Sequence, residues 1–162
     1  MNNWYDTAQI CLNGHVINSM AQSSPENNQK FCDQCGAETI TNCKSCNAPI
    51  RGYYHVEGAI VLQDYTAPSF CYNCGKPYPW IEKKLMAAKE LADEIDSLSE
   101  EEKEILKKSI DELVEGGPKI EVASVRFKKI VGRAGSQFAQ AFKEILIDVL
   151  SEAAKKAIWP NP

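Results

Sequence analysis

Four closely spaced pairs of metal-ligand residues constrain the fold of this chain more than any other feature of its sequence. Three pairs follow the pattern C-x2-C and one follows C-x3-H; they are Cys32 with Cys35, Cys43 with Cys46, Cys71 with Cys74, and Cys11 with His15. A tight turn within such a pair lets both donor atoms converge on one ion. The spacing therefore predicts metal sites rather than scattered free thiols.

The number and type of these donors favour zinc. Eight donors are what two tetrahedral sites require, and seven thiolates with one imidazole suit Zn²⁺. Gly36 and Gly75 directly follow the second Cys of their pairs, where the backbone must turn sharply. In the stretch CLNGH, the Asn-Gly pair is also a tight-turn signal. An iron–sulfur centre is the alternative because it uses the same residue types.

The gaps between the pairs favour a sequential arrangement of two sites. Gaps of 16 and 24 residues within the two proposed sites each accommodate a short hairpin. Cross-braced sites usually have nearly adjacent second and third pairs, whereas seven residues separate Cys35 from Cys43 here. We therefore expect one site from Cys11, His15, Cys32 and Cys35, and a second from Cys43, Cys46, Cys71 and Cys74. His55 is the alternative eighth ligand, but it lies in a strand-like run, YYHV.

The predicted zinc ions are structural and not catalytic. A catalytic zinc normally keeps three protein ligands and one open position, whereas four donors close each predicted site. No Glu stands beside a ligand as in the H-E-x-x-H or H-x-E motifs. Phosphate-binding loops and nucleophile motifs are also missing from the sequence. We therefore expect no catalytic residues and no enzymatic activity.

The chain changes character at about residue 80, which predicts an α+β protein of two parts. Residues 1–79 hold every Cys and both His, and we expect a double zinc-ribbon region of β-hairpin knuckles there. Residues 80–162 show apolar residues at helical spacing and predict an all-α helical bundle. Four helices are expected, at about 80–97, 99–115, 118–131 and 136–158. Ser99 with Glu102 forms a capping-box signature at the start of the second helix.

Several motifs resemble an uncharacterised family of bacterial double zinc-ribbon proteins with a C-terminal helical tail. They are the C-x-NGH start, FCDQCG, NCKSCNAPIRGYYH and FCYNCGKPYPW. The resemblance covers the first 80 residues well and the tail more loosely. It implies the metal ligands and the ribbon fold, and it implies no particular activity.

The leading functional hypothesis is a protein-interaction or adaptor module of the cytoplasm. Neither a signal peptide nor an apolar run long enough to span a membrane is visible. The expected fourth helix is apolar over a wide arc, which indicates either a buried bundle helix or an interface to a protein partner or a second copy. Its apolar residues are Phe138, Ala141, Phe142, Ile145, Leu146, Val149, Leu150, Ala153 and Ala157.

Two further hypotheses rest on basic residues. Nucleic-acid binding would use the segment RFKKIVGR through Arg126, Lys128, Lys129 and Arg133. Against it stand the net charge of −4 for the chain and the excess of acidic residues in the ribbon region. Membrane action by the fourth helix would use Lys155, Lys156 and Trp159, but acidic residues interrupt that polar face.

Overall fold

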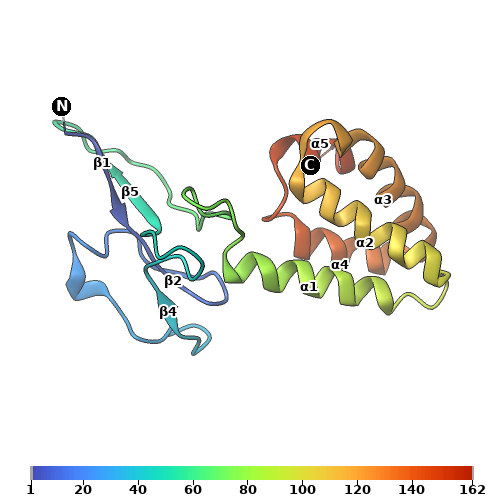
Figure 1. Cartoon of the computed structure of the whole chain (residues 1–162), viewed down its shortest axis with the longest axis horizontal. Helices are drawn as coiled ribbons and strands as arrows, with labels where there is room; N and C mark the ends of the chain where they lie inside the picture. Colours follow the sequence, from blue (N-terminus) through green and yellow to red (C-terminus); the bar gives the residue numbers. More distant parts are fainter. Residues whose placement is uncertain (1, 162) are drawn as a thin grey trace. The chain divides into compact units, whose positions relative to one another are not determined.

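The computed structural model describes residues 2–161, which form two compact units that divide between Glu82 and Lys83. The first unit consists of short strands and long loops, whereas helices dominate the second (Figure 1). The division falls inside the first helix, α1 (Pro79–Asp93). This order of elements confirms the predicted α+β class, with small sheets followed by a helical region.

Two small antiparallel sheets organise the first unit. Strand β1 (Trp4–Thr7) pairs with β5 (Arg51–His55), and the two lie side by side in Figure 1. Strand β2 (Gln9–Cys11) lies between β3 (Val16–Asn18) and β4 (Thr39–Ile40). A short 3-10 helix, η1 (Pro25–Asn27), lies in the connection between β3 and β4. The strand-like run YYHV belongs to β5 as far as His55, and Val56 forms only an isolated bridge with Ala59.

The apolar core of the first unit is small. Ile10, Ile50 and Ile81 are its large buried aliphatic side chains, and Tyr78 and Trp80 add two stacked rings. Four of the predicted ligands are buried with them: Cys11, Cys32, Cys43 and Cys71. The interior of this unit is therefore built largely around its thiols.

A buried carboxylate joins β1 to β5 and to the loop after β3. Asp6 accepts hydrogen bonds from the backbone N–H of Thr7 and of Gln22, and from the Ser23 hydroxyl. His55 Nε2 lies 2.9 Å from Asp6 Oδ2. Burial opposes ionisation of this carboxyl, but the bonds from Ser23, His55 and the two N–H groups together lower its pKa. Asp6 is therefore ionised, and its hydrogen bonds link β1 to β5 and to the loop after β3.

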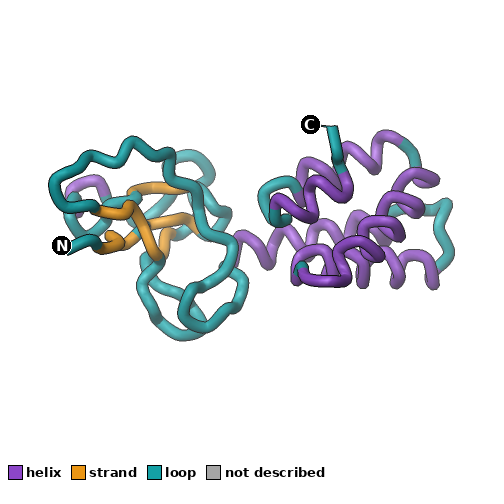
Figure 2. The backbone as a smooth tube through the Cα atoms, turned by 90° about the horizontal axis from the view of Figure 1, so that it is seen from above, coloured by secondary structure: helices purple, strands orange, loops and turns teal. Residues whose placement is uncertain are grey.

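Helices make up the second unit almost entirely (Figure 2). After α1, they are α2 (Glu100–Glu115), α3 (Ile120–Ala134), α4 (Ser136–Leu146) and α5 (Glu152–Ile158), with a 3-10 turn η2 (Gly117–Lys119) before α3. Helix α3 contacts α2, α4 and α5. The predicted capping box is confirmed, because Ser99 and Glu102 each bond to the other's backbone N–H.

The single helix expected over 136–158 is wrong, because this segment forms α4 and α5 with a turn at 147–151. Ser151 ends the turn and caps α5, since its hydroxyl accepts the Ala154 N–H. Val149 and Leu150 lie within this turn, and both are buried.

The wide apolar arc of this segment is largely used within its own unit. Phe142, Leu146, Leu150, Ala154 and Ile158 are buried in one core with residues of α1, α2 and α3. Phe142 packs edge-on against Phe127 of α3, with ring centroids 5.6 Å apart. Of the two interpretations of this arc, buried helix or interface, the packing favours the buried helix.

Across residues 2–161, the helices are too short or too polar for any of them to cross a membrane.

Candidate metal centres

The three C-x2-C pairs lie on three turns with the same backbone hydrogen bonds. In the first turn, the Cys32 N–H donates to the Ala37 carbonyl and the Gly36 N–H donates to the Cys32 carbonyl. The same two bonds recur from Cys43 and Asn47, and from Cys71 and Gly75. The residue after the second Cys has a φ of 73° at Gly36, 63° at Asn47 and 73° at Gly75. Asn47 was not singled out from the sequence, although Asn tolerates this left-handed conformation.

The CLNGH turn presents Cys11 and His15 from the end of β2 and the start of β3. The Cys11 N–H donates to the His15 carbonyl, and the Gly14 N–H donates to the Cys11 carbonyl. Gly14 has a φ of 92°, and a Cβ there would lie 3.0 Å from Trp80 Cβ. A side chain at Gly14 would therefore be strained and would press on the buried indole.

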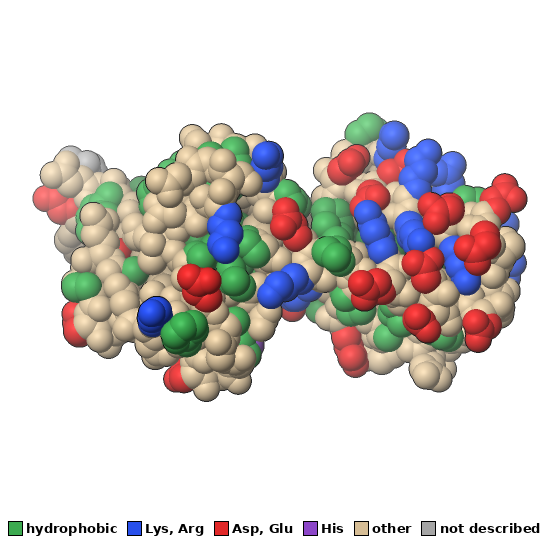
Figure 3. All heavy atoms as spheres, turned by 60° about the horizontal axis from the view of Figure 1, so that its bottom comes forward, with side chains coloured by type: hydrophobic (Ala, Val, Ile, Leu, Met, Phe, Trp, Pro, Cys, Tyr) green, Lys and Arg blue, Asp and Glu red, His purple; other side chains and the backbone are tan. Residues whose placement is uncertain are grey.

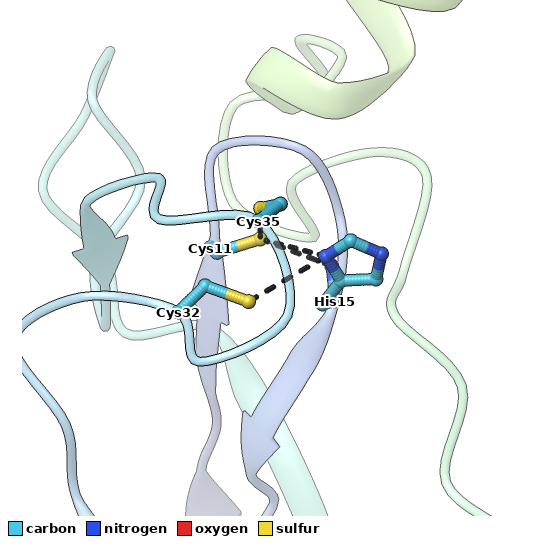
Figure 4. Close-up of side chains that lie close together, drawn as sticks. All are labelled: Cys11, His15, Cys32 and Cys35. Atoms are coloured by element: carbon cyan, nitrogen blue, oxygen red, sulfur yellow. Dashed lines mark hydrogen bonds between the residues drawn. The ribbon is translucent and has the colours of Figure 1, made fainter.

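The first site gathers Cys11, His15, Cys32 and Cys35. Nδ1 of His15 lies 3.5 Å from the sulfurs of both Cys11 and Cys32, and the sulfurs of Cys11 and Cys35 are 3.8 Å apart. Figure 4 shows the three sulfurs and this ring nitrogen pointing toward one another, while the other nitrogen of His15 points away. Nδ1 is therefore the donor atom that His15 offers to the site.

The second site gathers Cys43, Cys46, Cys71 and Cys74. The sulfurs of Cys43 and Cys74 are 3.8 Å apart, and those of Cys46 and Cys71 are 3.6 Å apart. In each site, the four donor atoms lie within 4.8 Å of one another. The structure thus groups the eight residues sequentially, as a site of three thiols with one imidazole and a site of four thiols. It places His55 in neither group.

The donor spacings match the edges of a zinc tetrahedron. Zinc bonds of about 2.3 Å to sulfur and 2.0 Å to nitrogen place two sulfurs about 3.8 Å apart and a sulfur about 3.6 Å from a nitrogen. A disulfide requires a sulfur–sulfur distance of about 2.05 Å, and all seven cysteines are free. The arrangement fits a tetrahedral ion and does not fit a disulfide framework.

Each site contains a thiol that ionises readily. The backbone N–H of Ala37, together with the Asn13 amide, lowers the pKa of Cys35 to about 6. The backbone N–H of Cys74 does the same for Cys71, whose pKa is also about 6. Burial raises the pKa of Cys11, whose proton a bound cation would displace. These hydrogen bonds favour thiolates, the form that binds a metal.

The basic residues of the predicted nucleic-acid site lie on α3, in the helical unit, which holds none of the eight metal donors. Arg126 is 3.7 Å from a carboxylate oxygen of Glu112, and Arg133 pairs with Glu102. Lys128 and Lys129 are exposed. On the face of the helical unit drawn in Figure 3, basic and acidic side chains alternate.

Two four-donor clusters on turn-based knuckles, followed by helices, define the class of double zinc-ribbon proteins with a helical region. Within this class, the chain belongs to a family described as "Uncharacterized protein conserved in bacteria (DUF2321)", whose model matches residues 4–158. The resemblance to a bacterial family of this kind is therefore confirmed. The comparisons with curated proteins and with solved structures yield no match.

Proposed function

We propose that the protein is a non-enzymatic interaction module of the cytoplasm, held in shape by one structural Zn²⁺ in each site. Each donor set, three thiols with an imidazole or four thiols, supplies all four positions of a tetrahedral ion. Such an ion keeps no position open for water or substrate, which supports a structural role. Seven unpaired thiols suit a reducing compartment.

The observation that carries the interaction role is a solvent-exposed surface of Tyr5, Arg51, Tyr54 and Tyr72, here called the tyrosine–arginine surface. Tyr5 and Tyr54 pack with ring centroids 4.6 Å apart and are 48% and 37% exposed. The Arg51 guanidinium lies 4.6 Å from the ring centre of Tyr5 and 4.0 Å from that of Tyr72. Arg51 is therefore held between two rings.

This composition is typical of protein-binding hot spots. Tyr and Arg are enriched there because they offer large contact areas that are already ordered. A shallow hollow of about 310 Å³ adjoins the surface and is lined by Tyr5, Arg51, Gly52, Tyr54, Gln63, Asp64, Tyr65, Thr66 and Pro68. The Tyr65 hydroxyl donates to the Arg51 carbonyl and fixes one wall. The surface is therefore ordered before any partner arrives.

The second metal site supports this surface directly. Tyr72 lies between Cys71 and Cys74 in the last knuckle. An ion bound by these thiols would therefore hold the turn that carries the Tyr72 ring against Arg51. This links the structural role of the metal to the proposed interaction.

The metal assignment predicts separate effects on the two sites. Replacing Cys32 by Ala should lower the zinc content from two ions per chain to one, because site two shares no ligand with site one. Replacing Gln34 by Ala in the same knuckle should leave two ions. Elemental analysis after gel filtration measures both. Loss of both ions from the Cys32 variant, or iron in place of zinc, would contradict the assignment.

The interaction role predicts a partner that depends on the tyrosine–arginine surface. Affinity capture from nuclease-treated cells should recover a specific protein with the native chain and lose it with the double variant Tyr5→Ala/Arg51→Ala. The control is Phe31→Ala, which removes a ring that is 53% exposed from the first knuckle. Equal recovery by both variants would show that the surface is not the contact.

Nucleic-acid binding through α3 is the second candidate function. Lys128 and Lys129 support it, but the acidic partners of Arg126 and Arg133 weaken it. If phosphate contacts dominate, affinity should fall steeply with salt, and Lys128→Ala/Lys129→Ala should flatten that dependence. We expect no binding at physiological salt. Submicromolar binding there, lost in the double variant, would reverse the ranking of the two functions.

A further inference from the structure

A cleft in the helical unit combines apolar walls with a ring of lysines. The cleft has a volume of about 360 Å³ and lies between the end of α4 on one side and α5 with residues 159–160 on the other. Its lining residues are Lys143, Ile147, Glu152, Lys155, Lys156, Trp159 and Pro160. Neither metal site nor the tyrosine–arginine surface uses any of them.

The positive charge of the cleft is only partly neutralised. Among the described residues that line it, Glu152 alone is acidic, and it pairs with Lys155 at 3.1 Å. Lys143 instead lies over the indole of Trp159, with its ammonium 5.9 Å from the ring centre. Lys156 is exposed. Two lysines are therefore available to an anion at the rim.

The remaining walls are apolar and partly open to solvent. Ile147 and Trp159 are half-buried and Pro160 is exposed, so their apolar faces line a hollow instead of closing it. The contact with Lys143 favours one orientation of the indole. An apolar group entering the hollow would cover these faces and gain from their desolvation.

The charge around the cleft limits the size of the anion. Residues 143–160 contain three lysines and three acidic residues, and all three lysines line the cleft, so this segment has no further positive side chain outside it. A polyanion such as nucleic acid would extend beyond the cleft and meet the exposed Glu144, next to Lys143 in the sequence. A single acidic headgroup is small enough to stay within the cleft and away from this acidic side chain.

We propose that this cleft binds an amphipathic anion, with its phosphate or carboxylate headgroup on Lys143 and Lys156 and its apolar body on Ile147, Trp159 and Pro160. Such a headgroup belongs either to a free acyl or alkyl acid or to an anionic lipid. Both sources share the chemistry that the cleft recognises. This site is independent of the interaction role proposed above.

The test is calorimetric titration of the zinc-loaded chain with decyl phosphate below its micelle concentration. We expect saturable binding of one molecule per chain, whereas decanol and inorganic phosphate each bind much more weakly. Lys143→Ala/Lys156→Ala should weaken binding about tenfold or more, because charged hydrogen bonds are lost. The control Lys108→Ala/Lys119→Ala removes the same charge from exposed positions of the helical unit that do not line the cleft, and it should leave the affinity unchanged.

Other outcomes overturn the proposal. Equal binding of decanol would remove the headgroup's role, and equal weakening by both lysine pairs would show a general charge effect. Circular dichroism and zinc content establish that the variants are folded.

Sedimentation with phosphatidylglycerol and phosphatidylcholine vesicles distinguishes the two sources of the headgroup, an anionic lipid and a free amphiphile. Binding to phosphatidylglycerol alone, sensitive to Lys143 and Lys156, identifies a lipid headgroup, whereas decyl phosphate binding without vesicle binding identifies a free amphiphile. Vesicle binding without decyl phosphate binding would exclude the cleft as the site.

Discussion

Removal of zinc should unfold the first unit and leave the helical unit folded. The large buried aliphatic residues of the first unit are Ile10, Ile50 and Ile81, which is too little apolar surface to offset the conformational entropy of its long loops. Zinc binding in comparable peptides contributes about 10–16 kcal/mol. The helical unit has its own core across α1 to α5, which contains none of the metal ligands.

Two spectroscopic signals separate the units after chelation. Far-ultraviolet circular dichroism should keep most of its helical intensity, because the α-helices lie at residues 79–158. Amide signals of residues 2–78 in a heteronuclear NMR spectrum should collapse into the narrow range of an unfolded chain. Zinc added back should restore them. Dispersed signals from this region in metal-free protein would show that the apolar core suffices without the ion.

The two clusters of metal-ligand residue types were predictable because each pair of donors forms locally in the chain. A C-x2-C pair needs only a tight turn, and glycine at 36 and 75 marks such turns in the sequence. The sequential grouping also followed from chain spacing alone. Asn47 gave a weaker signal, since Asn occupies the left-handed region less often than Gly.

Features that join distant segments were beyond the reach of sequence patterns. The tyrosine–arginine surface brings residues 5, 51 and 72 together from two strands and a knuckle. The Asp6 carboxylate likewise joins β1 to Ser23 and to His55. The sequence around Asp6 does not predict its contacts with Ser23 and His55, because both contacts depend on how β1 lies against β5 and the loop after β3.

In the helical unit, the apolar pattern correctly predicts helix but does not reveal the turn that divides residues 136–158 into two helices. Apolar spacing over 136–158 is nearly continuous, so periodicity predicts one helix. Ser151 caps a new helix, and Val149 and Leu150 are both buried in the turn before it. Both residues fit a helical pattern, which is why only the capping Ser distinguishes the two structures.

Phe142→Asp should unfold or severely destabilise the helical unit, with no need for a partner to explain the effect. Phe142 is fully buried and meets Phe127 edge-on. Truncating such a ring to Ala costs about 3–5 kcal/mol, and a buried carboxylate without a partner adds a further desolvation penalty. The total is comparable to the whole stability of a domain this size, about 5–15 kcal/mol.

The matched control is Val125→Asp on α3, which introduces the same carboxylate where the native side chain is 60% exposed. It should change the free energy of unfolding by no more than about 0.5 kcal/mol. Urea unfolding of both variants, followed by circular dichroism with zinc present, measures the difference, and sedimentation velocity measures assembly. A Phe142→Asp chain that keeps its unfolding midpoint but loses self-association would show that the apolar arc is an interface between copies. The burial of Phe142, Leu146 and Leu150 within one chain leads us to expect the opposite, because a side chain already enclosed by its own unit has no surface left to offer a second copy.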